Sequence, residues 1–183
     1  LLLGLAAAAF AGALPVAAQE AGAAIGWTTC ADADEHPPPI AAECATLSRP
    51  LVAGSPDSGR IELALRRIRG GDGPAPIRLW YVAGGPGDSA ASALHRLRDV
   101  FPDPDIDLYA LDHRGTGGSR RLGCPEQEAP DSTDGSEIVA AEWPACIEWI
   151  TTQRDDLEAL TATASADDLA AAIHAVSAEP ARD

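Results

Sequence analysis

Two glycine-rich turns, each placed directly after an apolar stretch with strand character, constrain this sequence more than any other feature. The first turn, residues 84–87, follows residues 77–82, and the second, residues 112–119, follows residues 106–111. Between them, residues 89–100 carry apolar side chains at helical spacing. A strand, a helix and a strand in this order predict a right-handed crossover between parallel strands. Both turns are then expected at one rim of a sheet, where open α/β folds build their sites.

A hairpin is expected before this crossover. Residues 42–47 and 60–69 are strand candidates, and the glycine-bounded polar stretch 54–59 between them predicts a turn. Residues 77–82 are apolar and β-prone on both faces apart from Arg78, which predicts a buried strand. The fold class is therefore α/β, with an N-terminal hairpin followed by the first parallel strands and helices of a three-layer sandwich.

The C-terminal part has the pattern of helices. Residues 136–151 can be helical, and Pro144 is expected to break or kink that helix. Residues 155–160 form a short amphipathic piece. Ser165 is expected to cap a further helix, with Asp168 as the second member of a capping box. Three apolar residues of that helix share one face: Leu169, Ile173 and Val176.

Composition bounds the size of the core and the kinds of partner. The chain has 183 residues, of which 46% are hydrophobic and 4% aromatic, which allows one domain with an aliphatic core. All thirteen basic residues are arginine, and the formal net charge is -15. Such a field repels nucleic acids and anionic membranes, so neither is expected as a partner. A solvated acidic surface accounts for the charge without any partner.

The first residues resemble a targeting segment. Residues 1–18 contain no charge, and a buried helix, a membrane span and a secretory apolar region are the three interpretations. Pro15 and the small residues before Gln19 favour a cleavable end, so residues 1–18 are interpreted as a signal-peptide remnant. We expect a secreted or periplasmic protein without stable membrane association after cleavage. Residues 19–40 are expected to be an extended segment, and residues 41–183 part of one domain.

The four cysteines are expected to form disulfides. None belongs to a C-x-x-C motif, so a zinc site is not expected. An even number of cysteines in an exported protein favours disulfides over the alternative of four buried thiols. Three pairings are possible, and the local one, Cys30–Cys44 with Cys124–Cys146, closes the shortest loops. No metal and no cofactor are implied.

The first glycine turn has three interpretations. A phosphate loop is disfavoured, because the Lys-Ser/Thr of a P-loop and the spacing G-x-G-x-x-G are both absent. A plain turn is the second. The third is an oxyanion hole, in which the backbone N–H of Gly84 or Gly85 stabilises the negative oxygen of a tetrahedral intermediate. Glycine lets the backbone approach a substrate, while Pro86 stiffens the turn and Gly87 completes it.

The second turn is expected to be structural rather than catalytic. Asp112 can accept backbone N–H groups, and Arg114 can pair with a carboxylate below the turn. Gly115 and Gly117 allow the tight path of the chain. The alternative is a catalytic role for Asp112 or His113.

Residues 84–90 (GGPGDSA) and 112–119 (DHRGTGGS) together resemble the α/β-hydrolase family of proline iminopeptidases and secreted tripeptidyl aminopeptidases. The similarity extends over about residues 25–178 and includes Trp27, the segment ECATL at 43–47, the four cysteines and residues 161–169. In this family the first motif begins with histidine, where this chain has Ala83. The resemblance implies an α/β-hydrolase fold and a serine peptidase.

The nucleophile of such an enzyme is not found in this sequence. No G-x-S-x-G motif occurs, and neither Ser89 nor Ser119 has the second glycine of a nucleophile elbow. Ser89 is instead expected to be a helix N-cap. The catalytic triad is therefore expected after Asp183, which makes this chain an inactive N-terminal fragment of an exported hydrolase. An aminopeptidase acting on peptides with a free N-terminus is favoured, and the alternatives are an esterase or a non-catalytic binding module.

Overall fold

The computed structural model describes residues 25–30, 41–73, 75–85, 87–133, 135 and 137–179. The expected signal-peptide remnant 1–18, most of the segment 19–40 and Pro86 lie outside the described residues. The strands are β1 Thr28–Thr29, β2 Ala42–Val52, β3 Ser55–Ile68, β4 Ile77–Tyr81 and β5 Ile106–Leu111. The helices are α1 Ala90–Val100, α2 Trp143–Gln153, a 3-10 helix Leu157–Ala159 and α3 Ala162–Ser177.

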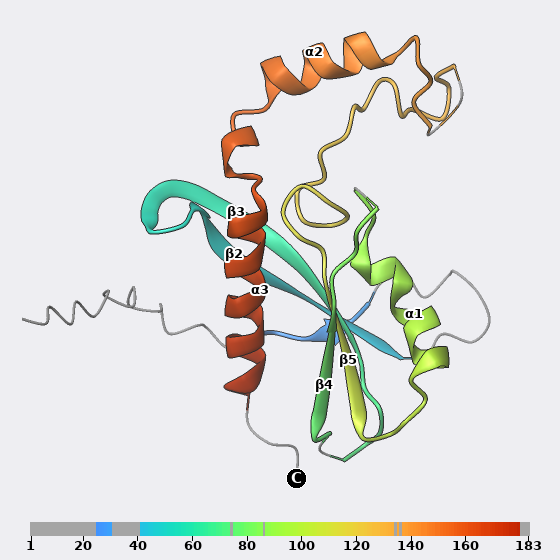
Figure 1. The fold of residues 1–183 in the computed structure, drawn as a ribbon, viewed down its shortest axis with the longest axis vertical. Coiled ribbons are helices and arrows are strands. Elements are labelled where there is room, and N and C mark those ends of the chain that lie inside the picture. Colours follow the sequence, from blue (N-terminus) through green and yellow to red (C-terminus); the bar gives the residue numbers. More distant parts are fainter. Residues whose placement is uncertain are drawn as a thin grey trace, which may run out of the picture.

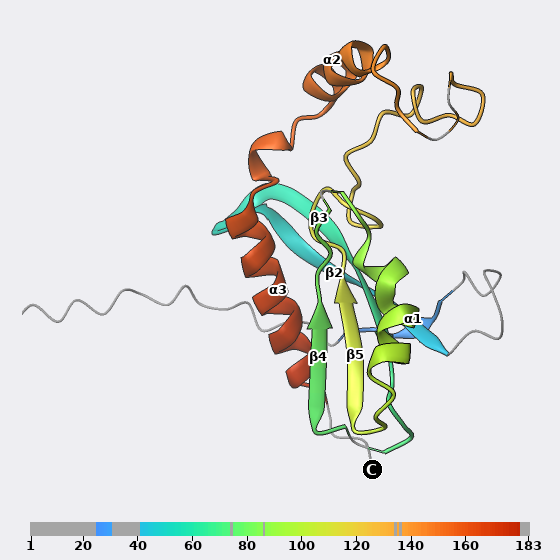
Figure 2. The same ribbon diagram turned by 45° about the vertical axis from the view of Figure 1, so that its right-hand side comes forward.

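The described strands form one mixed sheet in the order β1-β2-β3-β5-β4. Strands β4 and β5 are parallel, with Ile77 opposite Ile106, and α1 connects them. The predicted crossover is therefore confirmed, as is the antiparallel hairpin of β2 and β3. Both parallel strands end at the same rim, toward which their arrowheads point in Figure 2. The two glycine-rich turns leave the sheet there.

The helices α3 and α1 cover opposite faces of the sheet (Figure 1). This follows from the alternation of β3, because successive side chains of a strand point to opposite faces. Ile61, Leu63 and Leu65 pack with Val176 of α3, whereas Ile68 packs with Leu94 of α1. Helix α2 lies apart from both, beyond the rim where β4 and β5 end.

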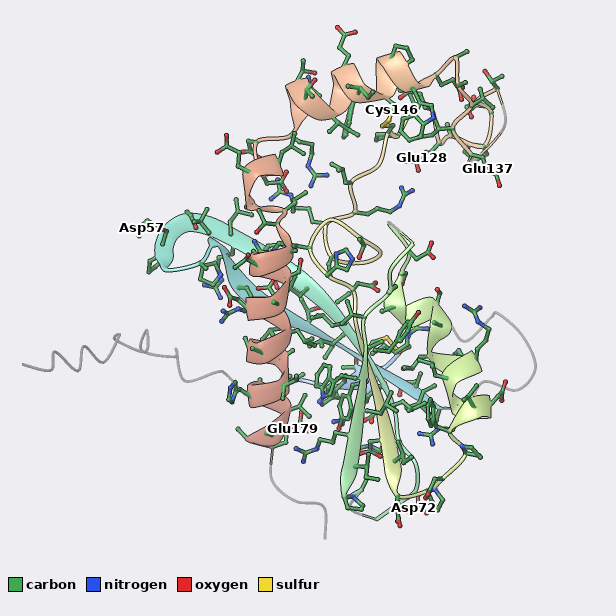
Figure 3. The ribbon with its side chains drawn as sticks, viewed as in Figure 1. Asp57, Asp72, Glu128, Glu137, Cys146 and Glu179 are labelled. Atoms are coloured by element: carbon green, nitrogen blue, oxygen red, sulfur yellow. A yellow bond between two sulfur atoms is a disulfide. The ribbon has the colours of Figure 1, made fainter. Side chains whose placement is uncertain are left out.

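The hairpin turn is much shorter than the sequence predicted. Strand β3 begins at Ser55, which pairs with Val52, so only Ala53 and Gly54 form the turn and the prediction for 54–59 was wrong. Gly54 has a φ of 75°, in the left-handed region that glycine adopts readily. Residues 56–59 of this stretch have no register partner in β2. The Ser58 hydroxyl holds them to the turn, because it accepts from the Val52 N–H at 2.9 Å and donates to the Ser55 carbonyl at 2.6 Å. Asp57 marks this tip in Figure 3.

Two helix boundaries also differ from prediction. Helix α2 begins only at Trp143, and residues 137–142, part of the predicted helix 136–151, are not helical. Pro144 therefore limits that helix at its start and does not kink it, because in the first turn its missing N–H costs no helical bond. Helix α3 is capped by Thr161, whose Oγ1 accepts a hydrogen bond from the Ala164 N–H at 3.1 Å, rather than by Ser165. Asp168 is consequently not part of a capping box. Of the three residues expected on the buried face of α3, Val176 is buried whereas Ile173 is exposed.

Strand β4 is not buried on both faces, as its composition predicted. It is the outermost strand of the described sheet, and Ile77 is 50% exposed. Trp80 of β4 stacks on Tyr109 of β5, with ring centroids 4.8 Å apart. An apolar sequence therefore identified the strand but could not establish that both of its faces were covered.

An arginine of β3 joins both ends of the described chain. The buried Arg67 donates to Glu43 of β2 at 2.7 Å and to Glu179, just beyond α3, at 2.9 Å. The Arg67 guanidinium also lies 4.0 Å from the centre of the Trp27 ring, and the Trp27 Nε1–H donates to Glu179 at 2.6 Å. Figure 3 shows Glu179 at the end of α3. Cys30 and Cys44 form a disulfide that fixes the same N-terminal segment to β2.

This cluster makes stability depend on pH. Burial raises the pKa of Glu43, but the hydrogen bonds and charges of Arg67 and Arg69 outweigh burial and hold that pKa below its ordinary 4.5. Because the folded-state pKa is lowered, the stabilisation is fully present above pH 4.5 and is lost as the pH falls through the folded pKa. Urea unfolding from about pH 6 to pH 3 should show a smaller acid loss in Glu43→Gln than in the unsubstituted protein. Glu158→Gln, at an exposed position, is the control, and equal acid losses in both variants would contradict the prediction.

Candidate functional site

The carboxylate of Asp112 organises the rim at which both glycine-rich turns lie. Asp112 directly follows β5 and is buried. Its Oδ1 accepts from the Ala90 N–H at 2.7 Å, the Ala91 N–H at 3.2 Å and the Ser89 hydroxyl at 2.9 Å. Its Oδ2 accepts from the Gly118 N–H at 2.9 Å. One carboxylate thus holds the start of α1 against the second turn, in the backbone-accepting role that the sequence suggested.

The second turn closes on itself around this carboxylate. A Cβ at Gly117 would lie 2.0 Å from Asp112 Oδ2, and the φ of Gly117 is 44°, so only glycine fits without displacing the carboxylate. The Ser119 hydroxyl donates to the Asp112 carbonyl and accepts from the Ala64 N–H of β3 at 2.8 Å. Gly115 also has a left-handed φ, 86°, and donates to the Ser119 carbonyl. The turn is therefore bonded to the sheet and cannot shift independently of it.

Arg114 and Asp168 form a buried ion pair below the turn. The Arg114 guanidinium donates to both carboxylate oxygens, at 2.8 and 3.0 Å, and both side chains are 2% exposed. Its third nitrogen donates to the carbonyls of Leu51 at 2.7 Å and Ala159 at 2.9 Å. Such a planar, bidentate contact suits arginine better than lysine. Arg114 therefore links the turn to β2, to the 3-10 helix and to α3.

The first glycine turn presents backbone N–H groups at the rim. Gly84 and Gly85 are exposed, and among the described residues their N–H groups make no hydrogen bond. Gly85 has a φ of 104°, in the region where an L side chain is strained. Gly87, with a φ of 102°, also requires glycine. These N–H groups are available to an acceptor that the described residues do not supply.

The serines at the rim are structural. Ser89 stands at the N-cap position of α1, but its hydroxyl donates to Asp112 instead of accepting from the helix, and Asp112 caps the helix in its place. Ser89 is therefore the N-cap residue, as predicted, but its side chain makes no capping hydrogen bond. Ser119 is fully buried and bonded on both sides. The His113 Nδ1 lies 3.3 Å from the Arg114 carbonyl, and within the described part of the chain no hydrogen bond joins the His113 side chain to either serine.

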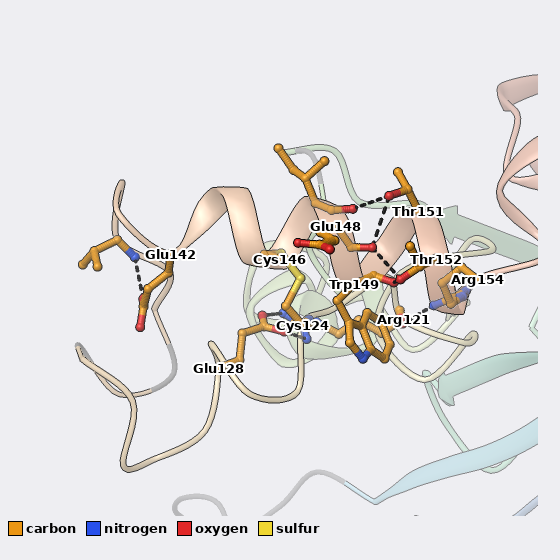
Figure 4. The surroundings of a disulfide bond; sticks show 12 residues. Arg121, Cys124, Glu128, Glu142, Cys146, Glu148, Trp149, Thr151, Thr152 and Arg154 are labelled. Atoms are coloured by element: carbon orange, nitrogen blue, oxygen red, sulfur yellow. Dashed lines mark hydrogen bonds and ion pairs between the residues drawn. A yellow bond between two sulfur atoms is a disulfide. The ribbon is translucent and has the colours of Figure 1, made fainter.

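A lobe formed by residues 121–153 stands over this rim (Figure 1). The disulfide Cys124–Cys146 closes it, so the structure has the local cysteine pairing that the sequence favoured. Glu128 accepts from the Cys124 N–H at 2.7 Å and from Arg121 at 2.9 Å, as the surroundings of the disulfide in Figure 4 show. The hydrogen bond from Arg121 has the largest effect on the pKa of Glu128. Together with the Cys124 N–H it outweighs burial and lowers that pKa.

The lobe is held to the body of the molecule by a second set of arginine contacts. Arg154, just after α2, donates to the buried Asp156 at 2.7 Å and to the Arg121 carbonyl at 3.1 Å. Arg120, with a φ of 56°, also pairs with Asp156, at 2.9 Å. Hydrogen bonding to Arg154, against the effect of burial, lowers the pKa of Asp156. Ion pairs therefore fix both ends of the lobe.

Two cavities lie near the rim. The larger, of about 650 Å³, is floored by β2 and β3 and reaches Ser89 and Asp112, but neither Gly84 nor Gly85 lines it. The smaller, of about 310 Å³, lies between the lobe and the first glycine turn and is lined by Gly87 and Asp88. Within the described ranges, no three side chains of His, Cys, Asp or Glu are gathered to hold a metal ion.

Sequence reasoning missed the partner of Arg114 and the bond between Ser89 and Asp112. A signal for the first exists, because Asp168 precedes Ala172 and Val176 at intervals of four on the buried side of α3. A carboxylate in such a stripe requires a buried cation. No comparable signal marks Ser89, because the hydroxyl of an N-cap serine usually serves its own helix.

The similarity of this chain to known proteins is remote and structural. No family model matches it, and no curated protein matches it. Among solved structures, a cold-adapted esterase from an Arctic intertidal metagenomic library is 13% identical, with a TM-score of 0.30, over 70% of this chain. The match spans half of the esterase.

The helices of the described residues are too short or too polar to serve as a membrane span.

Removal of the Asp112 charge should loosen the rim. In Asp112→Asn, the amide NH₂ must face at least one of the N–H or O–H donors that the carboxylate now satisfies. We expect a loss of roughly 2–4 kcal/mol in the free energy of unfolding, measured by urea titration. Asp88→Asn, at an exposed carboxylate in the neighbouring turn, should change it by less than about 0.5 kcal/mol. Equal effects of the two substitutions would refute the organising role of Asp112.

Removal of the Arg114 partner should be costly. Asp168→Ala leaves a guanidinium buried without its counter-charge, which costs about 3–5 kcal/mol. Asp167→Ala alters an exposed carboxylate on the adjacent helix position and should be nearly neutral. Thermal and urea unfolding of both variants measure the difference, and a neutral Asp168→Ala would contradict the assigned ion pair.

Proposed function

We propose that this chain is the N-terminal part of an exported serine hydrolase of α/β-hydrolase fold, and that the whole protein is an aminopeptidase. The observation that carries the proposal is the first glycine turn. Its Gly84 and Gly85 N–H groups are exposed, have no acceptor among the described residues, and stand at the rim where two parallel strands end. Donors in this arrangement suit an oxygen that becomes negative during a reaction.

In the proposed mechanism this chain supplies one half of the oxyanion hole, namely the N–H groups of the first glycine turn. A serine hydroxyl from the polypeptide after Asp183 attacks the carbonyl carbon of the substrate, and a histidine takes the hydroxyl proton. The C–O⁻ of the tetrahedral intermediate accepts hydrogen bonds from the glycine turn and from the residue after the serine. The C–N bond then breaks, the histidine proton goes to the leaving amine, and water hydrolyses the acyl-enzyme. Neither Ser89 nor Ser119 takes part as nucleophile.

Several further features support export and a peptide substrate. Two disulfides are typical of a protein that folds in an oxidising compartment. The resemblance of the two glycine motifs to the proline iminopeptidases and secreted tripeptidyl aminopeptidases favours a peptide with a free N-terminus as substrate. The acidity of the chain disfavours nucleic acid as a partner.

The experiment uses the complete polypeptide, including the sequence after Asp183, with a fluorophosphonate that labels activated serines. We expect one label, located by peptide mass spectrometry after Asp183, and hydrolysis of peptide amides that stops when the substrate N-terminus is acetylated. Absence of label, or a label on Ser89 or Ser119, overturns the hydrolase assignment made here. Turnover of simple esters without turnover of peptide amides overturns only the aminopeptidase assignment and favours an esterase.

A further inference from the structure

We propose that the cavity between the lobe and the first glycine turn is a specificity pocket that takes one apolar side chain of the acyl part of the substrate. The proposal rests on the proposed function for its substrate, but the cavity itself is a separate observation. It has about 310 Å³, at the lower end of the range for ligand pockets, which suits one side chain and not a whole peptide.

The position of the cavity links it to the oxyanion turn. Gly87 and Asp88, which line it, belong to the same tight turn as Gly84 and Gly85. A substrate whose carbonyl oxygen reaches those N–H groups has its adjoining substituents within a few bond lengths of this opening. The opposite wall is formed by α2 and by the segment before Cys124.

The lining is apolar where the cavity meets the lobe. Leu122, Ile138, Trp143 and Ile150 contribute to it, and two of them remain substantially open to solvent: Leu122 is 37% and Trp143 is 48% exposed. Large apolar side chains that are exposed together around a hollow are typical of binding sites. An apolar occupant covers them and gains the burial of its own surface.

The charges around the cavity disfavour an acidic occupant. Arg121 and Glu128 form an ion pair whose charges offset each other, and Glu128 also accepts from the Cys124 N–H. Asp88 is exposed at the lining and leaves a net negative charge there. A carboxylate side chain is therefore repelled, whereas a neutral apolar one is not.

The walls are held in place before any ligand arrives. The Cys124–Cys146 disulfide joins the segment that bears Leu122 to the helix that bears Trp143. Arg154 binds the Arg121 carbonyl at 3.1 Å and anchors the end of that helix. A pocket with such walls is preformed, so an occupant loses little affinity to ordering of the protein.

The test measures kcat/KM of the complete polypeptide on fluorogenic amides and esters whose acyl group carries a methyl, isobutyl, benzyl or carboxyethyl side chain. We expect the isobutyl and benzyl substrates to be preferred and the carboxyethyl substrate to be the poorest. Trp143→Ala should lower kcat/KM for the isobutyl and benzyl substrates by about 10-fold or more, and for the methyl substrate by less than about 2-fold.

Ile147→Ala is the matched control, because Ile147 is 55% exposed on the same helix but does not line the cavity. Leu122→Trp is the second variant, which should exclude the benzyl substrate by bulk and spare the methyl one. If Trp143→Ala and Leu122→Trp both show the same kcat/KM values as Ile147→Ala on all four substrates, the pocket assignment is wrong.

A failure of the proposed function gives a different result. In that case no substrate is turned over and the fluorophosphonate leaves no label. The pocket is then tested by titration with leucinamide, followed by tryptophan fluorescence. Saturable quenching that is present in the unsubstituted protein and in Ile147→Ala, but absent in Trp143→Phe, supports the pocket. Absence of any saturable change overturns it.

Discussion

The rim of this sheet depends on one carboxylate that has four donors and no charged partner among them. Asp112 bonds the first two N–H groups of α1, the Ser89 hydroxyl and the Gly118 N–H. Each of these donors would otherwise be an unsatisfied group at a helix start or in a turn, and an unmet buried donor costs about 1–3 kcal/mol. The helix dipole adds a favourable interaction with the same negative charge. The crossover helix and the second turn therefore take their mutual position from Asp112.

In the rest of the fold, arginine side chains join separate elements as Asp112 does at the rim. Arg67 joins β3 to both ends of the described chain, and Arg114 joins the second turn to α3. The buried Arg98 of α1 donates to four carbonyls, two of which belong to Ile68 and Ile106, and burial lowers its pKa despite the nearby Asp107. A planar guanidinium can satisfy several acceptors at once, which an ammonium on a flexible stem does less well. The use of arginine for every basic residue is consistent with this structural role.

Local patterns in the sequence predicted what depends on neighbouring residues. The crossover, the hairpin and the cysteine pairing follow from apolar runs, glycine turns and loop lengths, and the structure contains all three. Features set by distant residues were not predictable. Asp168 was assigned to a capping box because its partner Arg114 lies 54 positions away, and β4 was expected to be buried because its neighbours in the sheet were unknown. Helix α3 begins at Ala162, after its N-cap Thr161. Thr161 and Ser165 both carry a hydroxyl suited to an N-cap, so the residue types alone did not decide between them.

The charge of the chain bears on what kind of anion the first glycine turn can receive. A field from a formal charge of -15 opposes the approach of a phosphate or another permanent anion from solution. In the oxyanion role proposed for Gly84 and Gly85, a neutral carbonyl group meets no such opposition, because its oxygen becomes negative only during the reaction. Asp112 cannot turn to accept from these groups, because its oxygens are already occupied. The Gly84 and Gly85 N–H groups therefore have no acceptor among the described residues, which is what the proposed oxyanion role requires.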